Sequence, residues 1–287
     1  SQFGAYLFYI GGVCFLGACV WPFIGRGFNR PYLGAFIGLL WFFMPNNLCA
    51  IFIEGNLARS LSMIFLPVFI YSVYKYLYNH KLRYIPLMVF TFLLMELCHL
   101  GYAGMVAIAV IIYGIVYIIQ KGRKKAALDV VISMIFGFML LGIWLVASLR
   151  GGITSLDNSE NMANFFQNLW ITINPFERLT RGFEYFYFGF ATLVVIVFGI
   201  LFGYKKSRTG FVTGFIILLM TTKSAYAVLK HLPGSQYLWM LRFISIALCM
   251  ILMSFLMWDR LKKTLVLMLC VLLVVDTIPS LSLIVGE

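Results

Sequence analysis

Charged residues are scarce in this sequence. Of its 287 residues, 11% are charged and 62% are hydrophobic, and only 10 are acidic. A soluble domain of this size needs far more polar side chains to cover its surface. The composition therefore excludes a soluble protein and predicts an integral membrane protein.

Clusters of metal-binding or disulfide-forming residues are also absent from the sequence. The six cysteines occur singly in or beside apolar segments, with no Cys-x-x-Cys pair and no histidine at metal-ligand spacing. This pattern argues against a disulfide framework and a zinc site, and we expect the cysteines to act as small apolar side chains. No pair of acids has ligand spacing either. The sequence therefore identifies no cofactor, although a divalent metal is possible.

Ten apolar runs predict ten membrane-spanning helices, because a helix needs about 20 apolar residues to cross the hydrocarbon. The runs cover residues 4–24, 32–53, 58–78, 84–99, 102–120, 126–148, 185–204, 210–229, 237–257 and 264–284. The chain begins inside the first run, without an initiator Met or a cleavage site, and we expect it to be a fragment of a longer protein. We predict one all-α, polytopic transmembrane domain over residues 1–287.

Basic residues concentrate in alternate loops between these runs. They are Arg26, Arg30, Lys75, Lys81, Arg83, Lys121, Arg123, Lys124, Lys125, Lys205, Lys206, Arg208, Arg260, Lys262 and Lys263. By the positive-inside rule these loops are cytoplasmic, so the net charge of +12 reflects topology and predicts no nucleic-acid partner. The other loops, at 54–59, 99–101, 150–184 and 223–236, should face the extracytoplasmic side of the membrane. Any site built from their polar residues should act there.

The outer segment 150–184 is too long for a simple connection and too apolar for disorder. Apolar residues recur in it with helical spacing from Phe165 to Ile173, and the pattern stops at Asn174-Pro175. We predict an amphipathic helix lying in the outer membrane interface. Such a helix could cover a cavity and guide a lipid, or it could simply pack over the bundle.

The polar segment from Glu54 to Arg59 separates two apolar runs. Asn56 could cap the helix that follows, and Arg59 falls in its first turn, where the helix dipole is already positive. A bound anion would make this arrangement favourable, because free backbone N–H groups and a guanidinium form a seat for phosphate or carboxylate. The alternative is that Arg59 pairs with Glu54 or with lipid headgroups.

Further polar residues occur near the predicted outer ends of the runs. Glu96 and His99 are three residues apart, which predicts a shared helix face and a possible pairing with Arg59 across a cavity. Arg242, near the start of the ninth run, and Lys223, near the end of the eighth, are further candidates for binding an anion. The alternatives are a structural role for His99 and snorkelling to lipid phosphate for Arg242.

A charge within the hydrocarbon needs a partner or a cavity. Asp276 lies about halfway along the last run, just before Pro279, and is the deepest acid of the chain. The sequence predicts no partner for it.

Several short motifs carry a resemblance to a known family. They are Gly55–Arg59 (Gly-Asn-Leu-Ala-Arg), the Leu66-Pro67 pair that follows, the helix end at Cys98-His99, and Leu241–Phe243 (Leu-Arg-Phe) at the start of a span. In order and spacing they resemble bacterial membrane proteins named pyruvoyl-tetrahydropterin-synthase-related, which are similar to YfhO-type and other GT-C glycosyltransferases. Nothing in the chain resembles a soluble pterin enzyme.

The resemblance implies a GT-C-like bundle with an extracytoplasmic cavity in the bacterial plasma membrane. Its substrates would be a polyprenyl-phosphate-linked sugar donor and a cell-envelope acceptor, with an inverting transfer between them. Arg59 and Arg242 would hold the donor phosphate, with Asn56 and Lys223 beside them.

The resemblance also assigns the catalytic roles. His99 and Glu96 would polarise the cavity. The catalytic carboxylate of GT-C enzymes usually follows the first transmembrane helix, and we expect it upstream of this fragment. Glu54 is the acid of this chain that could act as the base, while the arginines stabilise charge on the leaving phosphate.

Three other classes are compatible with ten spans and outward arginines. A drug/metabolite-type transporter should show internal repeats, and none is visible. An O-antigen ligase or polymerase would share the lipid-linked substrate and differ in the group transferred. A non-catalytic scaffold in contact with membrane lipids would need no base.

Overall fold

The computed structural model describes residues 2–52, 54–150, 172–174, 187–231, 240–258 and 261–281. Within these ranges the chain forms α-helices and no β-strand, which confirms the predicted all-α membrane fold. Most of the predicted interfacial helix at 165–173 lies outside the described residues.

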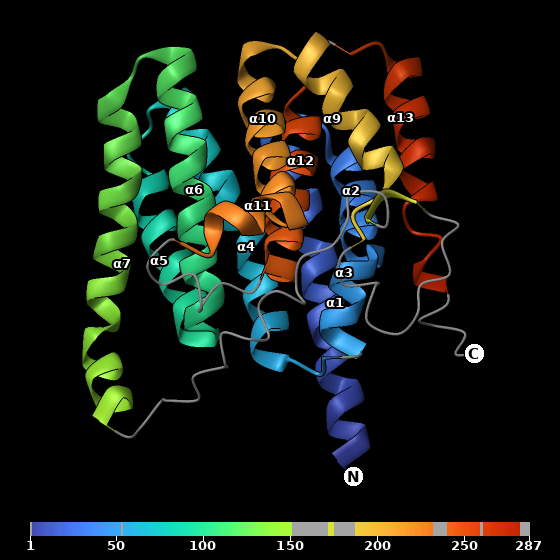
Figure 1. Ribbon diagram of the computed structural model, residues 1–287. Helices are drawn as coiled ribbons and strands as arrows, with labels where there is room; N and C mark the ends of the chain where they lie inside the picture. Colours follow the sequence, from blue (N-terminus) through green and yellow to red (C-terminus); the bar gives the residue numbers. More distant parts are fainter. Residues whose placement is uncertain are drawn as a thin grey trace.

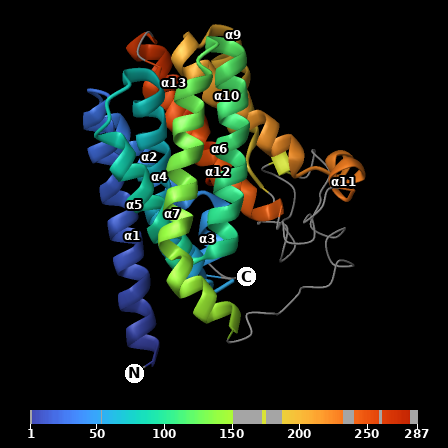
Figure 2. The same cartoon turned by 90° about the vertical axis from the view of Figure 1, so that its left-hand side faces the viewer.

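Most of the helices follow one another in alternating directions along a common axis, while α3 continues the path of α2 after a bend (Figure 1). They are α1 (Gln2–Gly27), α2 (Pro31–Phe43), α3 (Pro45–Phe52), α4 (Leu57–Asn79), α5 (Tyr84–Cys98), α6 (Leu100–Lys121), α7 (Lys124–Arg150), α9 (Phe190–Phe202), α10 (Lys205–Met220), α11 (Lys223–Leu229), α12 (Met240–Met257) and α13 (Lys263–Val275). The short helix α11 projects from the side of the bundle (Figure 2).

Four helices in the described residues are long and apolar enough to cross a membrane. They are α4, α6, the Lys124–Gly142 part of α7, and α12, and the bent pair of α2 and α3 would make a fifth. Helices α5, α9 and α13 are apolar but shorter. The protein is therefore membrane-embedded, while the count of ten spans stays a prediction.

Two of the predicted runs are broken helices. The run at 32–53 bends by 56° between α2 and α3. The cause is Pro45, because the residue before a proline avoids the helical region, and Met44 is extended with ψ of 133°. The run at 210–229 ends its first helix at Met220 and continues as α11 in a new direction.

The predicted basic loops meet at one end of the bundle. The turns between α1 and α2, α4 and α5, α6 and α7, and α9 and α10 lie at the upper end in Figure 1, as do the end of α12 and the start of α13. Arg30 Nη1 donates to the carbonyl oxygen of Trp258 at 2.9 Å, and Arg123 contacts His80 across two neighbouring turns. Which side of the membrane this end faces stays a prediction.

Helix α12 forms the centre of the bundle. Nearly all of its residues are buried, from Met240 to Leu256. It packs closely on α10, where a Cβ on Gly210 would come within 1.9 Å of Ser254 Oγ and a Cβ on Gly214 within 2.5 Å of Ile251 Cγ1. Small residues allow such close approach of helices in membranes. The start of α12, at the other end of the helix, contacts α3 and the start of α6, where the candidate site lies.

Candidate functional site

A tight turn joins α3 to α4 at the end of the bundle away from the basic loops. Gly55 has a φ of 57°, a left-handed conformation that glycine adopts without strain. The backbone N–H of Glu54 donates to the carbonyl oxygen of Cys49 at 2.9 Å, and that of Asn56 donates to Ala50 at 3.2 Å. These bonds fold the turn back on α3 and bring Glu54 beside the first turn of α4.

Asn56 caps α4, as the sequence predicts. Its Oδ1 accepts a hydrogen bond from the backbone N–H of Arg59 at 2.9 Å. The hydroxyl of Ser60 donates to the carbonyl oxygen of Asn56 at 2.9 Å. The cap thus occupies one of the helix N–H groups that the anion-site interpretation left free.

Arg59 is fully buried, with a side-chain exposure of 0%. Its Nη1 lies 2.7 Å from Glu54 Oε1, and its Nη2 donates to Asn46 Oδ1 at 3.1 Å. The alternative prediction of a Glu54 partner is therefore confirmed. Arg59 Nε and Glu54 Oε2 are buried, and neither atom has a hydrogen-bond partner in the described part of the chain.

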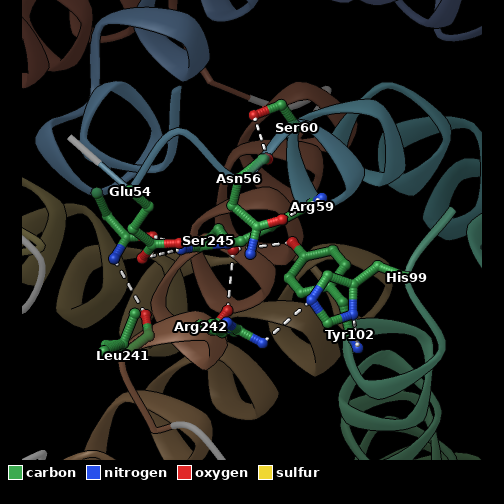
Figure 3. A network of polar contacts seen from close by, with 10 residues as sticks. Glu54, Asn56, Arg59, Ser60, His99, Tyr102, Leu241, Arg242 and Ser245 are labelled. Atoms are coloured by element: carbon green, nitrogen blue, oxygen red, sulfur yellow. Dashed lines mark hydrogen bonds and ion pairs between the residues drawn. The ribbon is translucent and has the colours of Figure 1, made fainter. Parts of the chain in front are cut away.

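His99 links the second arginine to this group. It lies between α5 and α6, and its Nδ1 accepts from the backbone N–H of Tyr102 at 3.2 Å. Its Nε2 faces Arg242 Nη1 at 3.2 Å (Figure 3). A neutral imidazole has one acceptor nitrogen, and a guanidinium can only donate. Two donors therefore face a ring that can accept from one of them.

Both arginines influence the protonation of His99. Burial lowers its pKa to about 4, and the positive charges of Arg242 and then Arg59 act in the same direction. His99 is therefore neutral at pH 7. Only a neutral ring has a nitrogen that can accept a hydrogen bond from the neighbouring donors.

The remaining contacts hold the start of α12 in place. Tyr102 OH donates to Ser245 Oγ at 2.8 Å, and Ser245 in turn donates to the carbonyl oxygen of Arg242 at 2.9 Å. Asn46 Nδ2 donates to the carbonyl oxygen of Leu241 at 3.0 Å. Figure 3 shows these contacts converging from α3, α4, α6 and α12.

Five of the predicted site residues meet in one group, which we name the arginine cluster: Glu54, Asn56, Arg59, His99 and Arg242. Sequence reasoning missed Asn46, Tyr102 and Ser245, which connect these residues. Asn46 interrupts an apolar run with a polar side chain, and this was the available signal.

Two predicted residues have no hydrogen bond or ion pair with the cluster in the described part of the chain. The predicted shared face of Glu96 and His99 is wrong, because α5 ends at Cys98 and His99 is extended with a φ of −155°. In the described part of the chain Glu96 has no ion pair with Arg59, and it lines a separate cavity. Lys223 is exposed at the start of α11 and has no hydrogen bond or ion pair with either arginine among the described residues.

A metal centre is not apparent in the part of the chain that the structure describes. No group of three or more His, Cys, Asp or Glu side chains there could hold a metal ion. The chemistry of the cluster is that of two guanidinium donors beside a carboxylate and a histidine ring.

The family model described as "6-pyruvoyl-tetrahydropterin synthase related domain; membrane protein" matches residues 1–284. No curated protein and no solved structure matches the chain. The matched range contains every residue of the arginine cluster.

Proposed function

Since the chain belongs to the 6-pyruvoyl-tetrahydropterin-synthase-related family of membrane proteins, we propose that it is a GT-C-type glycosyltransferase whose arginine cluster binds a lipid phosphate. The ligand is a polyprenyl-phosphate-linked sugar, and the acceptor belongs to the bacterial cell envelope. The cluster faces the extracytoplasmic side, because it lies at the end opposite the basic loops.

The observation that carries this proposal is that two guanidinium groups lie in one network: Arg242 Nη1 is 3.2 Å from His99 Nε2, and the Arg59 guanidinium lies over the ring of Tyr102. Arg59 comes from α4 and Arg242 from α12, and both act on the charge of His99. Guanidinium groups bind phosphate oxygens through paired, charge-assisted hydrogen bonds. A phosphate beside His99 would accept charge-assisted hydrogen bonds from these guanidinium groups.

In the proposed reaction an acceptor hydroxyl attacks the anomeric carbon of the sugar. The new C–O bond forms as the bond from that carbon to the lipid phosphate breaks, and the phosphate leaves with the electron pair. The hydroxyl proton goes to Glu54, whose Oε2 has no hydrogen-bond partner among the described residues. Arg59 and Arg242 stabilise the charge that develops on the phosphate.

Native mass spectrometry of the purified protein with added polyprenyl phosphate tests the proposal. We expect one bound lipid, and binding weakened by about tenfold or more in Arg59→Ala and in Arg242→Ala, since each removes charge-assisted hydrogen bonds. Arg123→Ala, at the basic end, is the matched control and should bind as the wild type does. Unchanged binding in both cluster variants would refute the phosphate site.

A second measurement separates binding from transfer. With a polyprenyl-phosphate sugar as the ligand, Glu54→Gln should retain the bound lipid but no longer release polyprenyl phosphate. Release at the wild-type rate would exclude Glu54 as the base.

A non-catalytic scaffold is the alternative that one observation favours. The Glu54–Arg59 pair already gives the buried guanidinium a partner, as a structural ion pair would. In that case polyprenyl phosphate would not bind to the wild-type protein.

A further inference from the structure

A cavity lies between α5, α6 and α7. It has a volume of about 400 Å³, within the range of small-molecule sites. Its lining is apolar apart from one acid, and includes Phe92, Glu96, Leu100, Ala107, Ile111 and Phe138. We name it the α5–α7 groove.

The groove opens toward the surface that faces lipid. Ile111 is 42% exposed, Ile135 53% and Phe138 45%, and all three line it. Exposed apolar side chains on membrane-crossing helices contact the bilayer. A molecule that enters the groove therefore comes from the membrane.

The length of the groove along α6 is about half the thickness of the hydrocarbon core of a bilayer. Leu100 and Ile111 mark its extent along α6, and at 1.5 Å per residue they are about 16 Å apart. The hydrocarbon core is about 30 Å thick. Leu100 is the first residue of α6, at the end away from the basic loops, so the groove runs from that end to about the middle of the membrane.

Glu96 provides a hydrogen-bonding group at the outer end of this apolar space. The residue is 2% exposed, and its Oε2 is buried without a hydrogen-bond partner among the described residues. Gly137 of α7 lies against it, since a Cβ there would be 3.8 Å from Glu96 Oε2. A buried carboxyl group without a partner is costly, and a hydrogen-bond donor from a ligand would offset this cost.

The charge of the lining indicates which lipid fits. Among the described residues, no Lys, Arg or His lines the groove. A phosphate beside the Glu96 carboxyl group would lack a counter-charge, which distinguishes the groove from the arginine cluster. An uncharged head with a hydroxyl group would supply the missing donor.

We propose that the α5–α7 groove binds one apolar chain of an uncharged, hydroxyl-bearing membrane lipid, whose hydroxyl donates a hydrogen bond to Glu96. The site goes beyond the proposed glycosyltransferase function and does not depend on it. It gives the protein a neutral-lipid site beside its proposed phosphate site.

Photo-crosslinking of the purified full chain tests this site. The probe is a long-chain alcohol with a diazirine in its chain, and the comparison probe is the corresponding alkyl phosphate. We expect the alcohol to label residues of α5, α6 and α7 in peptide mapping. The alkyl phosphate should label them about tenfold less at equal concentration.

Variants then assign the binding to the groove. Ala107→Trp fills the cavity, and Glu96→Leu removes the acceptor; each should lower labelling by about tenfold. Glu96→Gln keeps an acceptor oxygen and should keep most of the labelling. Val197→Trp, on an exposed face of α9, is the matched control for a new tryptophan and should label as the wild type does.

Either of two results would overturn the proposal: undiminished labelling of α5, α6 and α7 in Ala107→Trp, or equal labelling of these helices by the alkyl phosphate. If Glu96→Leu does not fold, the Ala107→Trp and Glu96→Gln results still decide the matter. Arg59→Ala should leave alcohol labelling unchanged, so failure of the phosphate site would not be mistaken for failure of this one.

Discussion

Asp276 and Thr192 join the end of α13 to the start of α9. Asp276 Oδ2 accepts from the backbone N–H of Thr192 at 2.6 Å and from its hydroxyl at 2.7 Å. Asp276 Oδ1 accepts from the backbone N–H of Ala191 at 3.1 Å and from Tyr187 OH at 3.3 Å. A carboxylate at a helix N-terminus satisfies free N–H groups and interacts favourably with the helix dipole. The buried acid is thus a cap supplied by another helix.

We expect Asp276→Asn to destabilise the fold by about 2 kcal/mol, because a neutral amide accepts fewer of these hydrogen bonds than the carboxylate does. Thermal unfolding in detergent, followed by circular dichroism, measures the effect. Thr277→Ala is the control, since the Thr277 hydroxyl bonds to the carbonyl oxygen of Val274 in its own turn. Equal midpoints for the two variants would contradict the capping role.

Gly189 should tolerate no side chain. Its φ is 101°, and a Cβ there would be 2.0 Å from Asp276 Cγ. We expect Gly189→Ala to destabilise the protein by about 2 kcal/mol or more, through backbone strain and displacement of the Asp276 carboxyl group. Gly142→Ala, inside α7 with nothing within 4 Å of the added Cβ, should instead be neutral or slightly stabilising. The same thermal measurement compares the two.

The Glu54–Arg59 pair should show strong coupling. Glu54→Gln leaves a buried guanidinium without its counter-charge, and we expect a loss of about 3 kcal/mol. In the double variant Glu54→Gln, Arg59→Gln the loss should be smaller than the sum of the single losses. Unfolding by increasing SDS in mixed micelles gives the coupling free energy. Additive losses would indicate that the two side chains do not stabilise each other.

His99 should remain neutral well below pH 7. With a pKa near 4, its ring signals in carbon-13 histidine NMR should stay constant from pH 8 to about 5. His99→Gln assigns the signals by their absence. A midpoint near 6.5 would show that burial and the arginines do not act on the ring.

The same pKa determines how stability depends on pH. The unfolded chain binds a proton at this histidine below about pH 6.5, whereas the folded protein binds it only near pH 4. The contribution of His99 should therefore lower stability as pH falls from about 6.5 to about 4. His99→Gln should remove this part of the pH dependence in thermal unfolding.

Features that depend on local sequence were predictable. Apolar runs located most of the helices, alternate basic loops located the turns of one end, and Asn56 identified a cap. In each case the residues involved are close in the chain, and helix geometry or membrane topology relates them directly.

Contacts between distant residues could not be predicted in this way. Asp276 and Thr192 are 84 residues apart, and Asn46 and Leu241 are 195 apart. No periodicity within a helix determines which helices become neighbours. Glu96 shows a further limit, because its predicted face assumed a helix through His99, and the helix ends one residue earlier.

The close contact between α10 and α12 has a consequence for how the protein assembles. Lipid tails are as apolar as the residues that cover α12, so little hydrophobic free energy drives it from the bilayer into the bundle. Its placement depends on shape, including the space left by Gly210 and Gly214. A bulky residue at either glycine should still allow α12 to insert, but as a helix that crosses the bilayer without its neighbours.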